Sequence, residues 1–293
     1  MRQRTIGDFT ISAIGLGTMP MSVEGRPSPE QSIATIHAAL DAGVTLLDTA
    51  DAYHLAGHNE AGHGEELIAR ALRQYGGDTS SVLVATKGGH LRPERGTWAL
   101  DGHPDYLKEA AKASAKRLGV DAIDLYQFHR PDPLVPFGDS VGALAELLDE
   151  GVIRMAGVSN TNSEQIRQAN AILNGRLASV QNQYSPQFVS SADEIMVCEA
   201  MSIAFLPWRP LGGISATSAR GEAYDIFREI AVSHDESPQV IALAWELAKS
   251  KCVIPIPGAS RPESIRDSVR ASVVDLTTEE LDRLDRALGI KVS

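Results

Sequence analysis

The stretch AIDLYQFHRPDPLVPFGDSVGALAELLDEGVIRMAGVSN, residues 122–160, contains one complete strand–helix–strand unit. Its two ends, 122–129 and 152–160, are nearly continuous apolar runs, which is the pattern of strands buried on both faces. Between them lies an amphipathic segment that we expect Asp139 to cap and Gly151 to end. Two buried strands joined by a helix pair in parallel with a right-handed crossover, so this stretch predicts an α/β fold.

The same unit recurs along the chain. Helical segments are expected to begin at Pro29, Pro104, Ser163 and Pro238. Buried strands are predicted at 11–18, 44–50, 81–87, 122–129, 152–160, 177–183, 202–208 and 252–258. Eight strand–helix units in a chain of 293 residues match the size of a (β/α)8 TIM barrel. We therefore expect one barrel domain over residues 1–293, closed below by an N-terminal β-hairpin at Gly7-Asp8 and carrying long loops on its C-terminal face.

A doubly wound nucleotide-binding sheet is the competing α/β architecture. Such a sheet carries a G-x-G-x-x-G loop after its first strand, but Gly15 and Gly17 are followed by Thr-Met-Pro, so the third glycine is missing. The phosphate loop G-x-x-x-x-G-K-S/T does not occur either. A nucleotide bound by this chain would therefore use neither of these two common loops.

Charge and composition restrict the partners. The formal net charge is −11 at pH 7, which disfavours nucleic acid and anionic lipid, because both require a basic face. The chain starts without an apolar signal region and has no apolar run of membrane-spanning length, so we expect a cytoplasmic protein without a membrane contact. Cys198 and Cys252 are expected to be small buried residues in a reducing compartment.

Four ionisable residues fall at or just beyond the ends of three consecutive predicted strands. Asp48 and Tyr53 follow the first of these strands, Lys87 ends the second, and His129 ends the third. Because the strand ends of a barrel converge at one mouth, we expect these four side chains to meet there. Each also has an ordinary interpretation, as a turn cap, a half-buried aromatic, a solvated strand end or a core histidine.

Together these four residues predict proton transfer to a carbonyl oxygen. Free tyrosine has a pKa of ~10, and a neighbouring lysine ammonium is expected to lower it toward the neutral range. Asp48 would keep the buried lysine charged, and His129 would orient the substrate oxygen and share the proton. Tyr53 would then act as a general acid toward an oxygen that becomes negative as hydride arrives.

The stretch DTADAYHLAGHNEAGHGEE, residues 48–66, permits a second interpretation. His54 and His58 have the i, i+4 spacing of helical metal ligands, which would suit a metal-dependent hydrolase. Glycines lie between and after them, so a continuous helix is not expected there. We therefore predict no metal site and a loop that leads to a helix from Glu65, with His54 near the substrate and with His58 and His63 in solvent.

An ordered series of motifs resembles the aldo-keto reductase superfamily over residues 4–289. The motifs are GLGT (15–18), LLDTADAY (46–53), LVATK (83–87), DLYQFH (124–129), GVSN (157–160), QNQYSP (181–186), PWRPLGG (207–213) and IPIPGASRPESI (254–265). The resemblance implies a (β/α)8 barrel that binds extended NAD(P)H without a Rossmann loop and reduces an aldehyde or ketone to an alcohol, or the reverse. It also implies a catalytic tetrad with Tyr53 as proton donor, formed by Asp48, Tyr53, Lys87 and His129.

The resemblance also implies a cofactor site, residue by residue. Ser159, Asn160 and Gln181 match the positions that bind the nicotinamide carboxamide. Trp208 stands where most members have a tyrosine stacked on the nicotinamide ring, and an indole stacks equally well. Arg209 stands where a serine is more usual and is expected at the pyrophosphate. The other expected cofactor residues are Gly17, Thr18, Met19, Asp48, Pro210, Leu211, Gly212, Gly213, Pro257, Gly258, Ala259, Ser260, Arg261, Asp267 and Ser268.

The adenosine end decides between NADPH and NADH. A lysine–serine pair common in some branches is replaced by Gly258-Ala259, and Ser268 takes the place of the usual asparagine. Ser260, Arg261 and Arg266 remain as candidates for the 2′-phosphate, whose oxygens suit the arginine fork. The alternative is an ordinary solvated helix start. We expect NADPH, with NADH as the second choice.

Substrate contacts are expected from the loops at the barrel mouth. Residues 88–104 form a long connection without periodicity, in which Trp98 is the one large aromatic, and we expect Met21, His54 and Trp98 at the substrate. The partner is a small carbonyl or alcohol, and the substrate, the reaction direction and the oligomeric state stay open. Two alternatives also stay open, a nucleotide-binding regulatory subunit with slow turnover and the metal-dependent hydrolase.

Overall fold

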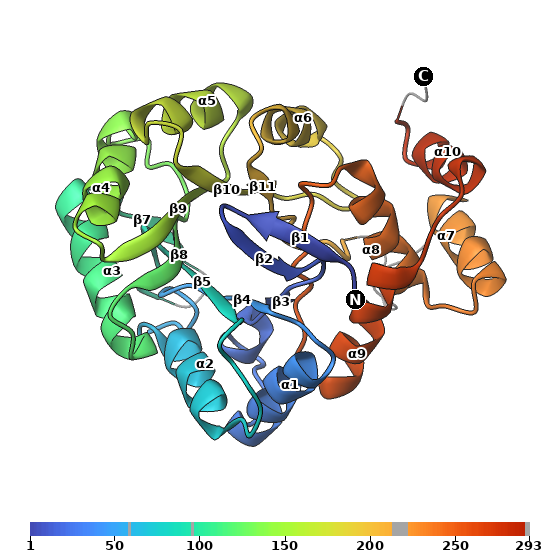
Figure 1. The fold of residues 1–293 in the computed structure, drawn as a ribbon, viewed down its shortest axis with the longest axis horizontal. Helices are drawn as coiled ribbons and strands as arrows, with labels where there is room; N and C mark the ends of the chain where they lie inside the picture. The colour runs from blue at the N-terminus through green and yellow to red at the C-terminus, as the bar shows by residue number, and fades with distance from the viewer. Residues whose placement is uncertain (58–59, 95–96, 213–221, 291–293) are drawn as a thin grey trace.

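The centre of the molecule is a parallel sheet rolled into a barrel with helices on its outside (Figure 1). The structure is a computed structural model that describes residues 1–57, 60–94, 97–212 and 222–290. Its strands, in chain order, are β3 (Leu16–Gly17), β4 (Leu46–Asp48), β5 (Leu83–Gly88), β8 (Ile123–Phe128), β9 (Ile153–Ser159), β10 (Leu177–Gln181) and β11 (Ala204–Phe205). All neighbours in the order β11-β10-β9-β8-β5-β4-β3 pair in parallel, which confirms the predicted fold class.

The eighth predicted strand, 252–258, is not a regular strand. In the described part of the chain it makes isolated bridges to β11 and β3, the two edge strands of the sheet. Pro255 and Pro257 lack an N–H and so remove two donors from a strand ladder. Their carbonyl oxygens still accept hydrogen bonds from the backbone N–H groups of Gly15 and Gly17, at 2.9 and 3.0 Å. The barrel is therefore closed by an extended segment whose prolines prevent regular pairing.

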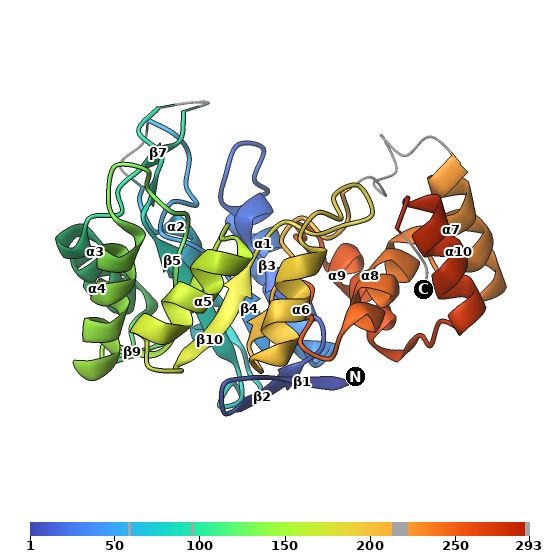
Figure 2. The same cartoon turned by 90° about the horizontal axis from the view of Figure 1, so that it is seen from above.

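An antiparallel hairpin covers the end of the barrel opposite the long loops, as predicted (Figure 2). It consists of β1 (Gln3–Ile6) and β2 (Phe9–Ser12), and Gly7 turns the chain with a φ of +53°. Ile6 and Ile11 are fully buried and share one apolar cluster with inward side chains of the barrel strands. Burial of these two side chains holds the hairpin against the barrel floor.

Helices surround the barrel and largely begin where the local signals place them. The ring consists of α1 (Pro29–Asp41), α2 (His63–Gln74), α3 (Pro104–Leu118), α4 (Phe137–Asp149), α5 (Ser163–Ile172), α6 (Ala192–Ala200), α8 (Pro238–Lys249) and α9 (Pro262–Arg270). Outside the ring, α7 (Glu222–Ser233) packs against α10 (Thr278–Ala287), and short 3-10 turns are η1 (Met19–Met21) and η2 (Ala271–Val273). Ser28 and Ser237 cap α1 and α8, and Asn162 forms a capping box on α5. Within the described ranges, no helix has both the length and the apolar character needed to cross a membrane.

Two helices begin earlier than predicted. Helix α4 starts at Phe137, so Asp139 lies in its first turn and does not cap it. The Phe137 ring lies 6.3 Å from that of Phe128 in the core, and this packing draws the helix start toward the strand end. Helix α2 starts at His63 and not at Glu65, directly after a left-handed glycine. The observed starts therefore lie three residues before the predicted one in α4 and two residues before it in α2.

The connection 88–104 is also more regular than predicted. It contains a short antiparallel ladder of β6 (His90–Leu91) and β7 (Ala99–Leu100). Residues 95–96, between the two strands in the sequence, lie outside the described residues. This hairpin rises beside the barrel mouth (Figure 2), and its residues His90 and Trp98 line a cavity there.

A buried acid lies just beyond β4. Asp51 is 6% exposed, and its Oδ1 has no hydrogen-bond partner among the described residues. Burial raises the pKa of Asp51 well above its ordinary value, the nearby Glu65 raises it further, and Arg117 opposes both. The folded protein therefore holds a proton that the unfolded chain releases above its ordinary pKa of 3.8. Because of this difference, the free energy of unfolding falls as the pH rises above that value.

Asp51→Asn is expected to stabilise the protein at neutral pH. The amide needs no protonation, so the free energy of unfolding should rise by about 1–3 kcal/mol, which is the scale of one unsatisfied buried polar group. The gain should shrink as the pH falls to about 4, where the unfolded aspartate is also protonated. Urea unfolding at several pH values measures this dependence, with Asp121→Asn, an exposed position, as the control. An equal effect at all pH values would contradict the buried-proton explanation.

Candidate active site

A buried ion pair forms the base of the site. Lys87 is fully buried, and its Nζ donates to Asp48 Oδ1 at 2.6 Å and to the Thr49 carbonyl oxygen at 2.7 Å. Asp48 Oδ2 accepts hydrogen bonds from Gln181 Nε2 at 2.8 Å and from Gln127 Nε2 at 3.4 Å. Both carboxylate oxygens are therefore bonded, which offsets the desolvation of a charged pair in the interior.

The strand register explains why these residues meet. Asp48 lies opposite Ala85 in the β4–β5 ladder, and Lys87 lies opposite Gln127 in the β5–β8 ladder. The carboxyl ends of three neighbouring parallel strands therefore reach the same level of the barrel. The prediction that these strand ends converge at one mouth is confirmed.

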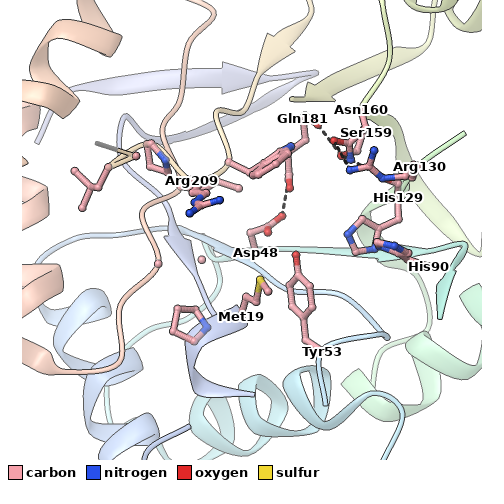
Figure 3. Close-up of a pocket in the computed structure, with 18 of the residues that line it drawn as sticks. Met19, Asp48, Tyr53, His90, His129, Arg130, Ser159, Asn160, Gln181 and Arg209 are labelled. Atoms are coloured by element: carbon pink, nitrogen blue, oxygen red, sulfur yellow. Dashed lines mark hydrogen bonds between the residues drawn. The ribbon is translucent and has the colours of Figure 1, made fainter. Parts of the chain in front are cut away.

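Tyr53 and His129 lie next to the ion pair. The Lys87 Nζ is 5.3 Å from the centroid of the Tyr53 ring, and the rings of Tyr53 and His129 are 5.8 Å apart at an angle of 80°. Both rings are at least nine-tenths buried, and Figure 3 shows the Tyr53 hydroxyl directed toward the middle of the pocket. The four residues of the predicted tetrad thus lie together, with Asp48, Tyr53 and His129 lining one cavity and Lys87 bonded to Asp48.

Lys87 lowers the pKa of Tyr53, as predicted, but the predicted net fall of this pKa is wrong. Burial raises the pKa of Tyr53 above its ordinary value, and the neighbouring Lys87 ammonium only partly opposes this increase. Burial lowers the pKa of Lys87, but Asp48 and Tyr53 outweigh burial, and the net shift is upward. At neutral pH the tyrosine is therefore a neutral phenol beside a charged ammonium.

His129 is a neutral imidazole. Burial lowers its pKa well below the ordinary value, and the charge of Lys87 adds to this effect. Its Nδ1 has no hydrogen-bond partner among the described residues, while its backbone carbonyl accepts from Asn160 Nδ2 at 2.9 Å. The ring can hydrogen-bond a ligand oxygen, but it does not carry a proton charge at neutral pH.

The hairpin β6–β7 adds a wall of packed rings, in which His90 meets His129 edge-on and lies tilted against Trp98. The ring of His90 lies 4.8 Å from that of His129 and 4.6 Å from that of Trp98, and the Arg92 guanidinium lies 4.7 Å from the Trp98 ring centroid. Arg92 also pairs with Glu24 and donates to the His54 carbonyl oxygen at 2.6 Å. Arg92 therefore ties this wall to the loops that follow β3 and β4.

The expected nicotinamide residues form one hydrogen-bonded group. Ser159 Oγ donates to the Gln181 carbonyl oxygen at 2.6 Å and accepts from Asn160 Nδ2 at 3.0 Å. Asn160 and Arg209 both hold a left-handed backbone with a φ of +58°, which is uncommon for residues with a side chain. Such conformations persist only where the surroundings enforce them, and they concentrate at functional sites.

These groups line one cavity of about 600 Å³ at the mouth of the barrel. Among the expected site residues, those that line it are Gly17, Met19, Asp48, Tyr53, Trp98, His129, Ser159, Asn160, Gln181, Trp208, Arg209, Pro210, Leu211, Gly212 and Gly258. Expected residues that do not line it are Thr18, Met21, His54, Lys87, Pro257, Ala259, Ser260, Arg261, Asp267 and Ser268. Lys87 lies behind Asp48, and Gly213 is outside the described residues.

Several of the excluded side chains have other partners. Met21 is fully buried in the core, and Thr18 Oγ1 donates to the Asp48 carbonyl oxygen at 3.0 Å. His54 is buried with its Nδ1 bonded to the Leu55 carbonyl oxygen at 2.8 Å. Asp267 accepts from Ser237 Oγ at 2.6 Å, which occupies one of its oxygens.

The cavity fits a nicotinamide nucleotide. A Cβ atom at Gly17 would lie 2.9 Å from the Ile256 carbonyl oxygen, so this wall admits only glycine and lets a ligand approach the backbone. The Trp208 ring borders the cavity, and its Nε1 is buried without a hydrogen-bond partner in the described part of the chain. The cavity is therefore lined by the apolar ring of Trp208, the side-chain amides of Asn160 and Gln181, and the guanidinium of Arg209.

No group of three or more histidine, cysteine or acidic residues that could hold a metal occurs among the described residues. His54 does not line the cavity, and His58 lies outside the described residues. His63 was expected in solvent, but it is half-buried at the start of α2, and burial lowers its pKa. The helix start two residues earlier than predicted explains this burial.

The sequence analysis missed Gln127 and five described cavity-lining residues, Pro20, His90, Arg130, Gln187 and Ile256, of which three bear on the chemistry. Gln127 donates to Asp48, whereas His90 and Arg130 line the cavity. His90 follows the end of β5 and Arg130 follows the end of β8, so the rule that strand ends carry function could have found both. Gln127 lies inside an apolar strand, and one buried glutamine there was the available signal.

The mouth of this parallel barrel holds the phenol of Tyr53, the imidazole of His129 and the buried Lys87–Asp48 pair. This combination is typical of a barrel oxidoreductase of the carbonyl-reducing class. A model of the Aldo/keto reductase family matches residues 13–288. The chain belongs to this family and is an NAD(P)H-dependent enzyme.

Named relatives agree with this assignment. The chain is 33% identical over 276 residues to the 6-dehydroglucose reductase of Novosphingobium aromaticivorans, covering 92% of this chain and 89% of that protein. It is 31% identical over 313 residues to the NADP(+) aldo-keto reductase yakc of Schizosaccharomyces pombe, covering 95% and 89%. The solved glycerol dehydrogenase of Gluconobacter oxydans superposes with a TM-score of 0.84 at 27% identity, covering 98% and 95% of the two chains.

Proposed function

We propose that this protein reduces an aldehyde or ketone to an alcohol with NADPH, and that Tyr53 supplies the proton. The observation that carries the proposal is the neutral phenol of Tyr53, which faces a nicotinamide-sized cavity beside the buried Lys87–Asp48 pair. When bound, the nicotinamide supplies hydride chemistry to the carbonyl carbon. The chain's own residues then have to hold the carbonyl oxygen and deliver one proton to it.

The geometry divides these tasks among the four residues. The protonated Tyr53 hydroxyl donates to the carbonyl oxygen and releases its proton as that oxygen becomes negative. Lys87 stabilises the resulting phenolate, and Asp48 keeps the lysine charged and fixed. His129 is neutral, so its role is to hydrogen-bond the oxygen and to orient the carbonyl, and it does not release the proton. The expected sharing of the proton by His129 is therefore not part of this proposal.

A panel of carbonyl compounds and alcohols tests the function. Absorbance of reduced nicotinamide is followed with NADPH and with NADH, and the panel includes sugar and polyol derivatives because two relatives act on 6-dehydroglucose and glycerol. Turnover with several carbonyls is the expected result. Tight cofactor binding with negligible turnover would instead support a regulatory subunit. Loss of activity after dialysis against a chelator would support the metal-dependent hydrolase.

NADPH is proposed over NADH because of the start of α9. Arg261 occupies the N-cap position of this helix and is exposed, and it has no ion-pair partner among the described residues. An arginine at a helix start offers both a guanidinium fork and a positive dipole end to a phosphate. Ser260 precedes it and offers a hydroxyl.

Arg261→Ala is expected to raise KM for NADPH about 10- to 100-fold, the scale of a lost charge-assisted hydrogen bond, while KM for NADH stays within a factor of two. Steady-state kinetics with one saturating carbonyl measure both constants. Arg270→Ala, at the C-terminal end of the same helix, serves as the matched comparison, because it removes one positive charge from α9 away from its N-terminus. Equal changes for both cofactors would contradict a role in recognising the 2′-phosphate.

Two organisational proposals accompany the function. We propose first that residues 1–293 unfold as one barrel domain. We propose second that the protein works in the cytoplasm, where its two free cysteines stay reduced. A single cooperative transition seen by both fluorescence and circular dichroism is expected for one domain. Cell fractionation of the tagged protein tests the location, and recovery in an extracytoplasmic fraction would contradict it.

A further inference from the structure

An arginine faces the substrate side of the cavity without an acidic partner. Arg130 directly follows the tetrad residue His129 and lines the cavity together with His90 and Trp98. Its Nη2 donates to Asn160 Oδ1 at 3.0 Å, and within the described residues no carboxylate lies within ion-pair distance of its guanidinium. Most of its five N–H groups therefore remain available to a ligand.

The charge of Arg130 is not cancelled by the rest of the cavity. Asp48 is the one acid among the described cavity-lining residues, and it is neutralised by Lys87 at 2.6 Å. His90 and His129 are neutral, since burial, to which the Arg130 charge adds, lowers both pKa values, that of His90 to about 4. The cavity is thus locally positive although the chain carries a net charge of −11. A cationic pocket in an acidic surface concentrates anions of matching size.

The other cationic residue of the cavity lies on a different side. Figure 3 shows Arg209 across the pocket from Arg130, with Asp48 and Tyr53 between them. Arg209 adjoins Trp208 and the expected pyrophosphate loop, so a cofactor phosphate would occupy Arg209. Arg130 instead adjoins His129 and the His90–Trp98 wall, where the substrate carbonyl must lie for Tyr53 to reach it.

We propose that Arg130 binds a carboxylate of the substrate, so that the enzyme prefers aldehydes and ketones that carry this group a few bonds from the carbonyl. The two parallel N–H groups of a guanidinium match the two oxygens of a carboxylate. A phosphate dianion fits less well, because a single cation faces this side of the cavity. The carboxylate only binds and does not react. The carbonyl carbon receives hydride, and the carbonyl oxygen receives the proton of Tyr53.

This inference rests on the proposed function, and matched substrates separate the two. Succinic semialdehyde is compared with butanal, and 4-carboxybenzaldehyde with benzaldehyde, using NADPH and the wild-type enzyme. The carboxylated member of each pair should have a kcat/KM at least about 10-fold higher. Turnover of the neutral aldehydes with no preference for a carboxylate would overturn the inference and leave the proposed function standing. No turnover of any carbonyl would overturn the proposed function itself.

Variants of Arg130 locate the effect. Arg130→Met should lower kcat/KM for the carboxylated aldehydes about 10- to 100-fold, mainly through KM, and change the neutral aldehydes less than about 3-fold. Arg130→Lys should recover part of the preference, since it keeps the charge and loses the fork. Arg73→Met, an exposed residue of α2, should change neither pair. Equal losses for charged and neutral substrates in Arg130→Met would show that the arginine only holds Asn160, and they would overturn the inference. A 3-phosphorylated aldehyde that outperforms succinic semialdehyde would overturn the choice of carboxylate.

Discussion

Tyr53→Phe is expected to lower kcat for carbonyl reduction by about 10²- to 10⁴-fold, the range that general acid catalysis contributes. The substitution removes the Tyr53 hydroxyl, which faces the middle of the cavity beside Lys87. The ring itself is retained, so its packing against His129 should persist. Because the expected nicotinamide contacts come from other residues, Kd for NADPH should change less than about 3-fold. Stopped-flow turnover and fluorescence titration of NADPH measure the two quantities.

Tyr75→Phe is the matched control for this variant. Its hydroxyl donates to Asp41 Oδ1 at 2.8 Å on the protein surface, far from the cavity lining. This variant should turn over at the wild-type rate. An unchanged rate in Tyr53→Phe would remove the proposed proton donor and, with it, the mechanism.

Lys87→Met is expected to abolish turnover and also to destabilise the fold by about 3–5 kcal/mol, the usual effect of breaking a buried ion pair. The substitution leaves the Asp48 carboxylate in the interior with hydrogen bonds from two glutamine amides but without a counter-charge. It also deprives the Tyr53 phenolate of its stabilising cation. Urea unfolding measures the stability, and a carbonyl assay below the midpoint measures turnover.

Two comparisons show whether charge is the reason. Lys112→Met breaks an exposed pair with Glu150 and should cost no more than about 1 kcal/mol. The double variant Lys87→Met with Asp48→Asn removes the unpaired charge, so part of the stability should return while activity stays absent. A double variant that is less stable than Lys87→Met alone would contradict the electrostatic explanation.

The barrel strands were predictable because each is buried on both faces. A segment such as 123–128 has to be apolar along its whole length, and this requirement is visible without knowing what covers it. Helix starts at Pro29, Ser163 and Pro238 were predictable because caps act over three or four residues. The start of α4 was not, because Phe137 packs against Phe128 from a different element.

In the candidate site, too, the sequence predicted some features and not others: it placed the four residues but did not give their ionisation states. Asp48, Tyr53, Lys87 and His129 stand at strand ends, so the rule for barrels brings them together before any coordinates are known. Their ionisation states could not be obtained in this way. The pKa of Tyr53 depends on how completely other elements bury it and on how close Lys87 comes, and burial proved to be the stronger of the two.

The sequence by itself therefore determined the barrel class, the family and the four residues at the mouth, because apolar runs, caps and motif order are properties of short segments. Only the tertiary structure decided how Pro255 and Pro257 close the barrel, that His90 joins the wall, and that Arg130 has no acidic partner among the described residues. Burial and the balance of charge depend on groups far apart in the chain, and folding alone brings those groups within a few ångströms of one another.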